Sequence, residues 1–255
     1  MPFEHQFTLW LLYFFAYGFV GWLWESGYVS FQKKKWVNSG FLNGPIIPVY
    51  GFSMVTVLAV IAPWKNNLLI LYLASAVVIT IIEYLTSWLM ELLFHARWWD
   101  YSKVPLNLNG RVALPISAFW GLGVVVIVKF IHPFVARGVN WLDGHYGIYA
   151  AIIMLAAAMF DFGFTLANAL AFGAATKRID AAIDAKKQEL KTHLDTQLDW
   201  LESYRQDAAA RARLPRLSAV QRRLLKSFPN LRLNDTTASA KDIEKLMTLL
   251  KNKRK

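Results

Sequence analysis

Five apolar stretches constrain the fold of this 255-residue chain more than any other feature. They cover residues 7–26, 46–63, 67–94, 113–134 and 147–172. A helix needs roughly 20 apolar residues to cross a hydrocarbon core of about 30 Å, and all five stretches are near that length. Because lipid offers no partners to the backbone, spanning stretches of this kind are helices. The sequence therefore predicts an all-α, polytopic membrane helix bundle of about five spans.

Charge divides the chain into two predicted domains. Residues up to Phe172 contain nine Lys or Arg and seven Asp or Glu, whereas those from Gly173 onward contain nineteen and ten. We therefore predict a transmembrane domain over 1–172 and a basic cytoplasmic helical tail over 173–255. The lack of cysteine excludes disulfides and thiol catalysis, and the scattered histidines and missing phosphate loop give no reason to expect a metal or a cofactor.

The positions of the cations predict the orientation in the membrane. Most of them follow the first, third and fifth stretches, whereas only Lys65 and Arg137 fall in loops on the opposite side. Positive loops stay in the cytoplasm, so the N-terminus is expected outside and the C-terminus inside. The N-terminus lacks the basic region and cleavage site of a secretory signal, which predicts a retained first span.

A short motif occurs twice at a constant offset of 66 residues. Trp-Leu-x-Glu ends at Glu25 and again at Glu91, and Leu-Asn-Gly contains Asn43 and later Asn109. This echo predicts two parallel helical hairpins related by an axis along the membrane normal. The four residues would then lie near one cytoplasmic surface. Coincidence is the alternative, because Trp, Leu and Gly are abundant in this chain.

The two Asn-Gly pairs have the order of helix entries. Asn43 precedes Gly44 and a proline, and Asn109 precedes the fourth apolar stretch. Two helix N-termini beside Arg97 and Arg111 would attract a phosphate or carboxylate. The alternative is that both pairs are ordinary tight turns.

Glu83 and Asp161 fall inside apolar stretches, where a charge costs at least about 2.5 to 3.5 kcal/mol. They predict a proton or cation relay, or a contact to a polar substrate. The alternative is a packing carboxyl that is bonded to neighbouring hydroxyl or amide groups. Glu83 and Glu91 share one face of the third stretch, and Asp100 belongs to the aromatic and charged segment that follows it, where it could simply pair with Arg97.

These observations select nine candidate substrate-binding residues and no catalytic residue: Glu25, Asn43, Glu83, Glu91, Arg97, Asp100, Asn109, Arg111 and Asp161.

The basic tail has its own helical periodicity. Apolar positions recur every three or four residues over 176–207, which predicts an amphipathic helix, and 240–250 predicts a second, short basic helix. We expect the tail to bind the anionic inner leaflet, with a protein partner as the alternative. Nucleic acid is not expected, because acidic residues interrupt the cations.

Long runs over residues 8–134 resemble the bacterial membrane-protein family labelled putative ABC-transporter type IV. The resemblance rests on motifs that agree in order and spacing: Gly21-Trp22-x-Trp24-Glu25, Asn38-Ser39-Gly40-Phe41-Leu42-Asn43-Gly44-Pro45, Glu83-Tyr84-x-Thr86-Ser87-Trp88-x-Met90-Glu91, Arg97-Trp98-Trp99-Asp100-Tyr101 and Asn109-Gly110-Arg111. It implies a multi-pass protein of the bacterial inner membrane, a permease-like subunit that works with a separate ATPase chain. The last apolar stretch resembles the family more loosely, and the tail is unmatched.

Three functions remain open, with transport preferred. The first is a permease-like transport component without its own ATPase, which would need partners or homo-oligomers because five spans are few for a carrier. The second is an enzyme acting on a lipid or a phosphate-bearing head group, and the third is a scaffold or regulator acting through its tail. Enzymatic activity is the less favoured expectation.

Overall fold

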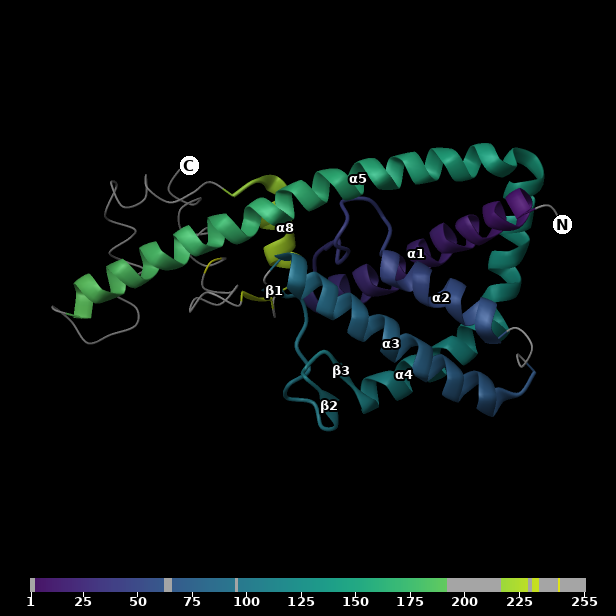
Figure 1. Cartoon of the computed structure of the whole chain (residues 1–255), viewed down its shortest axis with the longest axis horizontal. Helices are drawn as coiled ribbons and strands as arrows, with labels where there is room; N and C mark the ends of the chain where they lie inside the picture. Colours follow the sequence, from purple (N-terminus) through teal and green to yellow (C-terminus); the bar gives the residue numbers. More distant parts are fainter. Residues whose placement is uncertain are drawn as a thin grey trace. The chain divides into compact units, whose positions relative to one another are not determined.

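The computed structural model describes residues 3–61, 66–94, 96–191, 217–228, 231–233 and 243, and most of them are helical (Figure 1). The helices are α1 (Phe3–Lys33), α2 (Pro48–Ile61), α3 (Leu68–Phe94), α4 (Leu114–Val126), the π-helical turn η2 (Ile127–Ile131), α5 (His132–Lys191) and α8 (Ala219–Ser227). Strands β1 (Ala96–Arg97) and β4 (Arg232–Leu233) form one antiparallel pair. Strands β2 (Asn107–Leu108) and β3 (Val112–Ala113) form another. The prediction of an all-α membrane helix bundle is confirmed.

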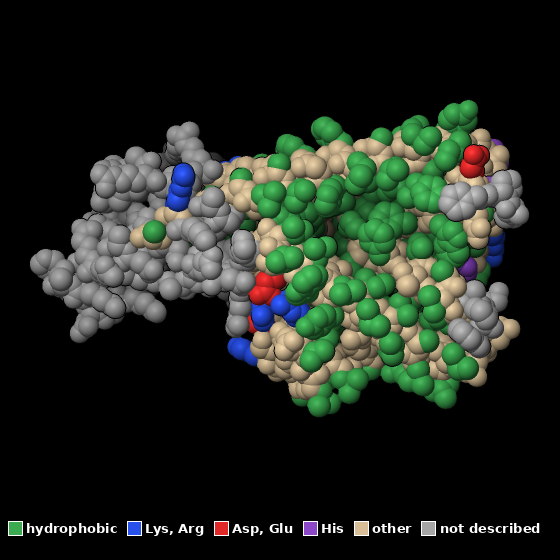
Figure 2. Space-filling model, in the orientation of Figure 1, with side chains coloured by type: hydrophobic (Ala, Val, Ile, Leu, Met, Phe, Trp, Pro, Cys, Tyr) green, Lys and Arg blue, Asp and Glu red, His purple; other side chains and the backbone are tan. Residues whose placement is uncertain are grey.

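Within the described residues, three helical segments are long and apolar enough to cross a membrane: Glu4–Lys33, Leu68–Phe94 and Leu114–Phe172. The apolar helix α2 is shorter. Hydrophobic side chains cover much of the face seen in Figure 2, as expected of a protein whose surface contacts lipid. The exact number of spans stays a prediction.

One helical segment runs through the fourth and fifth predicted stretches. Residues between them continue the helix through η2 and the first part of α5. The segment bends at Gly147, whose φ of 45° and ψ of −127° are not helical. Because an L side chain would be strained at this positive φ, glycine is the residue suited to the bend.

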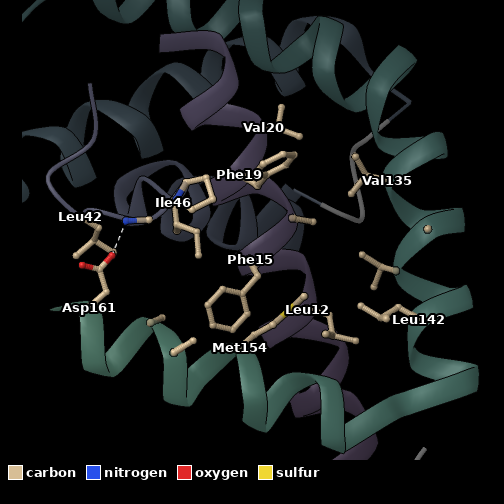
Figure 3. A pocket seen from close by; sticks show the side chains of 17 residues that line it. Leu12, Phe15, Phe19, Val20, Leu42, Ile46, Val135, Leu142, Met154 and Asp161 are labelled. Atoms are coloured by element: carbon tan, nitrogen blue, oxygen red, sulfur yellow. Dashed lines mark hydrogen bonds between the residues drawn. The ribbon is translucent and has the colours of Figure 1, made fainter. Parts of the chain in front are cut away.

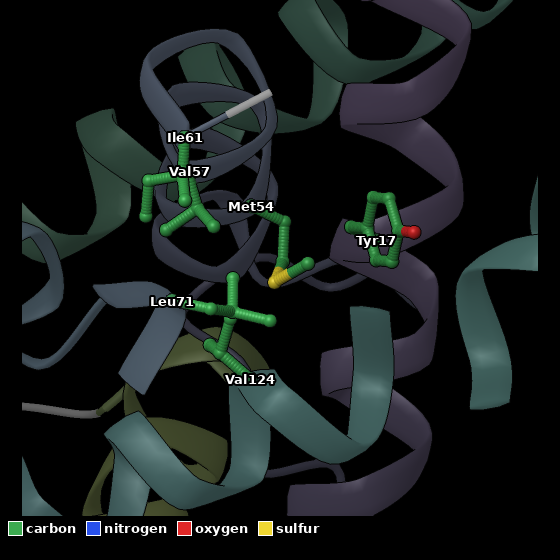
Figure 4. Packing of buried hydrophobic residues seen from close by; sticks show 6 residues of the cluster. All are labelled: Tyr17, Met54, Val57, Ile61, Leu71 and Val124. Atoms are coloured by element: carbon green, nitrogen blue, oxygen red, sulfur yellow. The ribbon is translucent and has the colours of Figure 1, made fainter. Parts of the chain in front are cut away.

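The described chain forms two compact units, the first comprising Met1–Leu89 and Asp100–Thr165. Its core joins α1, α2, α3 and α4, as Figure 4 shows, through six buried side chains: Tyr17, Met54, Val57, Ile61, Leu71 and Val124. A smaller apolar cluster joins α1 to α5 through Leu12, Val139 and Ala151. Packing of apolar side chains therefore joins the helices of this unit.

Glycines bring helices of the first unit into close contact. A Cβ added to Gly51 of α2 would lie 2.6 Å from the backbone oxygen of Phe14 in α1. A Cβ added to Gly121 of α4 would lie 3.1 Å from the backbone oxygen of Tyr72 in α3. Small residues at helix crossings are typical of membrane bundles, because they let the backbones approach.

The loop between α1 and α2 returns along the last turns of α1. The backbone N–H of Val37 donates to Ser30 Oγ at 2.9 Å, and that of Ser39 donates to Ser26 Oγ at 3.1 Å. The N–H of Ile47 reaches the carbonyl of Gly18 at 3.0 Å. Hydroxyls of α1 thus satisfy a non-helical backbone, as irregular segments inside a membrane protein require.

The second unit comprises Met90–Trp99 and Leu166–Lys255. Within it, the ring of Trp98 contacts the rings of Phe228 and Phe94, at centroid distances of 4.8 Å and 5.6 Å. Ser218 forms a capping box at the start of α8, and its hydroxyl donates to Asn168 Oδ1 at 2.8 Å. These contacts attach the described part of the tail to α5.

Parts of the predicted tail lie outside the described residues. Helix α5 continues to Lys191, whereas the rest of the predicted amphipathic helix over 176–207 is not described. Only residue 243 is described in the predicted helix over 240–250. The amphipathic tail and the domain boundary at residue 172 stay predictions.

Candidate functional site

The first carboxyl of the candidate site is held by a tyrosine from the neighbouring helix. Tyr50, in the first turn of α2, donates its hydroxyl to Glu25 Oε2 of α1 at 3.0 Å. The ring of Tyr50 lies against Gly21, where an added Cβ would approach Tyr50 Cγ to 2.3 Å. Trp120 of α4 contacts the same ring edge-on, at a centroid distance of 5.5 Å. Three helices therefore fix the position of this tyrosine.

The second carboxyl is held in a similar way. Tyr101 follows the end of α3 and donates its hydroxyl to Glu83 Oε1 at 3.1 Å. The backbone N–H of Tyr101 donates to the carbonyl of Gly110 at 2.8 Å. The loop after α3 therefore folds back and places a phenol on a carboxyl inside the apolar helix.

These two pairs belong to one polar group, which we call the Glu–Tyr cluster (Glu25, Tyr50, Glu83 and Tyr101). Burial raises the pKa of the Tyr101 hydroxyl, Glu83 raises it further, and Glu25 adds to the same effect. Tyr50 likewise interacts electrostatically with both Glu83 and Tyr101. Residues from α1, α2, α3 and the following loop thus meet in a partly desolvated environment.

One oxygen of the cluster has spare capacity. Glu83 Oε2 is buried and has no hydrogen-bond partner among the described residues. A buried acceptor of this kind is uncommon and costs free energy unless a ligand, an ion, water or a proton satisfies it. The partner of Glu83 is Tyr101, from the loop after α3, rather than a hydroxyl or amide group close to it in the sequence.

Asp100 and Asn109 build the loop that carries Tyr101. Asp100 Oδ1 accepts hydrogen bonds from the backbone N–H of Ser102, at 2.9 Å, and from its hydroxyl. Asn109 and Gly110 have φ values of 54° and 68°, and their turn connects β2 to β3. An Asn-Gly turn between antiparallel strands matches the type that requires positive φ at both positions.

The prediction that Asn109 opens a helix is therefore wrong. Helix α4 begins at Leu114, and its N-cap residue Ala113 makes no side-chain cap. Asn109 instead donates to the hydroxyl of Tyr84 at 3.1 Å. The Arg111 guanidinium lies over the Tyr84 ring at 5.7 Å, a cation–π arrangement.

Asn43 and Gly44 bind a carboxylate, but it comes from the same chain. Asp161 Oδ1 accepts from the backbone N–H of Asn43 at 3.1 Å and from its Nδ2 at 3.0 Å, and Oδ2 accepts from the N–H of Gly44 at 2.7 Å. Thr165 donates its hydroxyl to Asp161 Oδ1 at 3.1 Å. The expected helix entry at Asn43 is wrong, because α2 starts only at Pro48.

The second unit contains the remaining predicted pair. Arg97 Nε donates to both carboxylate oxygens of Glu91 at 3.1 Å. A pairing of Arg97 with Asp100, the alternative drawn from the sequence, stays a prediction. Glu25 and Glu91, equivalent in the predicted repeat, thus have a tyrosine and an arginine as partners, and the repeat stays a prediction.

Two tyrosines of the cluster escaped the sequence reasoning. From the sequence, Tyr101 stands out only as part of the aromatic and charged segment after the third apolar stretch, and nothing singles out Tyr50. A phenol near a buried carboxyl can be suspected, but no local pattern names its partner. A further missed pair is Tyr17 and His132, whose hydroxyl and Nδ1 are 2.6 Å apart.

The chemistry of the cluster is that of oxygen acceptors and phenol donors. No group of three or more His, Cys, Asp or Glu that could hold a metal ion occurs within the searched, described part of the chain. The two carboxyls can hold protons or accept hydrogen bonds from a cationic or polar ligand. The two tyrosines keep the carboxyls oriented.

Comparison with known proteins places most of the first unit in one family. The family model described as putative ABC-transporter type IV matches residues 12–166. This match includes all four residues of the Glu–Tyr cluster as well as Asp161 and its partners. No curated protein and no solved structure matches the chain significantly.

Proposed function

We propose, from the premise that the chain belongs to the putative ABC-transporter type IV family, that it is a permease-like transport subunit without its own ATPase. Family membership and the apolar helices make it an ABC-transporter-related membrane protein. The proposal adds a role for the Glu–Tyr cluster. It would be the polar site that a substrate or coupling ion occupies during passage through the bundle.

The buried and unsatisfied Glu83 Oε2 is the observation that carries this proposal. Ionisable groups within membrane helices are costly, and they commonly mark substrate or ion pathways. Tyr101 satisfies one oxygen of Glu83 and leaves the other for a donor. The arrangement favours a proton, or a substrate with a cationic or hydrogen-bond-donating group.

The remaining parts of the proposal concern partners and orientation. A separate ATPase chain would supply energy, since this sequence has no phosphate-loop motif. The subunit would lie in the bacterial inner membrane with its N-terminus outside and its basic tail on the anionic inner leaflet. Homo-oligomers would complete the pathway.

The enzyme alternative has lost part of its basis. It relied on two helix starts that would hold phosphate, but Asn43 and Gly44 bind Asp161, and Asn109 lies in a strand-to-strand turn. The scaffold alternative depends on a tail that is described only in part. Neither gains a specific supporting contact.

The experiment is affinity purification of the tagged chain from its native membrane in mild detergent. We expect a chain with a phosphate-loop ATPase motif to copurify, and the complex to hydrolyse ATP in proteoliposomes. Glu83→Gln should keep the partner but lower ATP hydrolysis at least about tenfold, since a hydrogen bond to a charged group contributes about 1.5–3 kcal/mol.

Glu4→Gln is the matched control, because Glu4 is exposed in the first turn of α1. It makes the same chemical change outside the cluster and should leave hydrolysis unchanged. The proposal fails if no ATPase chain copurifies, or if Glu83→Gln and Glu4→Gln give equal rates.

A further inference from the structure

A second feature of the first unit is an apolar cavity of about 620 Å³. It lies between α1, the loop before α2 and the two arms of α5 on either side of the Gly147 bend (Figure 3). Its walls include Phe15, Phe19, Ile46 and Met154. Apart from Asp161, every described residue that lines it is apolar or glycine. The volume falls within the range of about 300–1,000 Å³ that is typical of small-molecule sites.

Asp161 gives this cavity one charged end. In Figure 3 its carboxylate lies beside the loop that contains Leu42, away from the Phe15 and Leu12 side chains. Oδ1 accepts hydrogen bonds from Asn43 and Thr165. Among the described residues, Oδ2 accepts one hydrogen bond, from the backbone N–H of Gly44. A carboxylate has about four acceptor positions in total. Oδ2 therefore keeps capacity for one further donor.

Asp161 lies in the half of its apolar stretch that is farther from the Gly147 bend. Near the Gly147 bend, Trp141 and Tyr146 are exposed, and His5 Nδ1 lies 3.3 Å from Asp143 Oδ2. Aromatic and charged residues together are typical of a membrane boundary. Asp161 lies fourteen residues beyond the bend, which is about 21 Å of helix. In a hydrocarbon core of about 30 Å, it is nearer to the opposite surface.

We propose that this cavity binds one acyl chain of a membrane phospholipid whose head group carries a primary ammonium. The apolar walls hold the acyl chain, because its methylene groups pack against apolar side chains such as Phe15, Phe19 and Met154. The ammonium group is attracted to Asp161, the charged group at the end of the cavity, by charge complementarity. The site is separate from the Glu–Tyr cluster and does not depend on its role in transport.

Gly138 offers a way to fill the cavity without disturbing the helix. It lines the cavity, and an added Cβ would meet no atom within 4 Å. Gly144, six residues later on the same helix, also has open space around an added Cβ but does not line the cavity. Gly138→Trp and Gly144→Trp therefore make the same chemical change inside and outside the proposed site.

The test is native mass spectrometry of the full chain in detergent, titrated with dioleoyl phosphatidylethanolamine or dioleoyl phosphatidylglycerol. We expect the wild type to retain the ethanolamine lipid at least about tenfold more strongly, as one charge-assisted hydrogen bond predicts. Gly138→Trp should lose this lipid and Gly144→Trp should retain it. Asp161→Asn should reduce the preference between the two lipids to about twofold or less.

Equal retention of both lipids by the wild type, or no retention of either, would overturn the proposal. So would retention by Gly138→Trp equal to that of Gly144→Trp. Circular dichroism and gel filtration check the fold of each variant, and Gly138→Leu replaces Gly138→Trp if the larger side chain prevents folding.

Discussion

The contact between α1 and α2 at Gly21 allows the sharpest prediction. In the Gly21→Ala variant, the new Cβ would lie 2.3 Å from Tyr50 Cγ and 2.6 Å from Tyr50 Cβ. These atoms are at the base of the side chain, so rotating the ring cannot relieve the clash. Either α2 or Tyr50 must move, and the hydrogen bond from Tyr50 to Glu25 is strained with it.

The size of the effect follows from two contributions. Overpacking a closely packed site costs about 1–3 kcal/mol. Weakening a hydrogen bond between neutral groups adds about 0.5–1.5 kcal/mol. Replacing glycine by alanine in a helix stabilises it by about 1 kcal/mol. This gain is the same in Gly21→Ala and in Gly27→Ala of the same helix, so it cancels when the two variants are compared. Gly27 is the matched control, because its added Cβ meets no atom within 4 Å.

We expect the free energy of unfolding of Gly21→Ala to lie about 1.5–4.5 kcal/mol below that of Gly27→Ala. Tryptophan fluorescence during reversible unfolding in mixed micelles with increasing sodium dodecyl sulfate measures both values. A difference below about 0.5 kcal/mol would refute the reasoning, because an overpacked site is not expected to cost so little.

Three further predictions concern the hydrogen bonds of the first unit. Tyr101→Phe should lower the free energy of unfolding by about 1–3 kcal/mol, because it leaves both oxygens of the buried Glu83 without a phenol donor, and the exposed Tyr28→Phe should change it by less than about 0.5 kcal/mol. The pKa of Tyr101 is raised in the folded state, so its contribution to stability should be complete below about pH 10 and decline as the pH rises above that value. Unfolding titrations should therefore show a less steep loss of stability above about pH 10 in Tyr101→Phe than in the wild type. Thr165→Val removes the hydroxyl that bonds both Asp161 and Asn43, so hydrogen exchange at the amides of Asn43 and Gly44 should accelerate about tenfold, and unchanged exchange would contradict the role given to Thr165.

The all-helical fold class could be predicted because it depends on the length of the apolar stretches and on the lack of hydrogen-bond partners in lipid. A stretch such as 67–94 has few ways to satisfy its backbone in lipid other than a helix. Helix α1 extends to Lys33, beyond its apolar stretch, because polar residues outside the lipid do not end a helix. The bend at Gly147 is harder to predict, since a glycine in an apolar helix is common and only its φ marks it as different.

The candidate site shows where local patterns stop being informative. Glu83 and Asp161 could be selected as candidate site residues from the free-energy cost of a charge in an apolar stretch, because such a group needs a partner. The partner itself depends on the fold: Asn43 reaches Asp161 across 118 residues of sequence. The Asn-Gly pairs were misassigned for the same reason, since one pair closes a strand-to-strand turn and the other completes a carboxylate site. Both satisfy the local preferences that also suit a helix start.

The short length of α2 has a consequence for the surrounding bilayer. Its 14 residues extend about 21 Å, whereas the 27 residues of α3 extend about 40 Å. A hydrocarbon core of about 30 Å matches neither helix. If α2 crosses the membrane, as the sequence predicts, the lipid beside it thins or meets the polar loop, whereas a helix as long as α3 tilts. The elastic deformation of the bilayer would then differ around the protein, and we would expect thinner membrane beside α2 than beside α3.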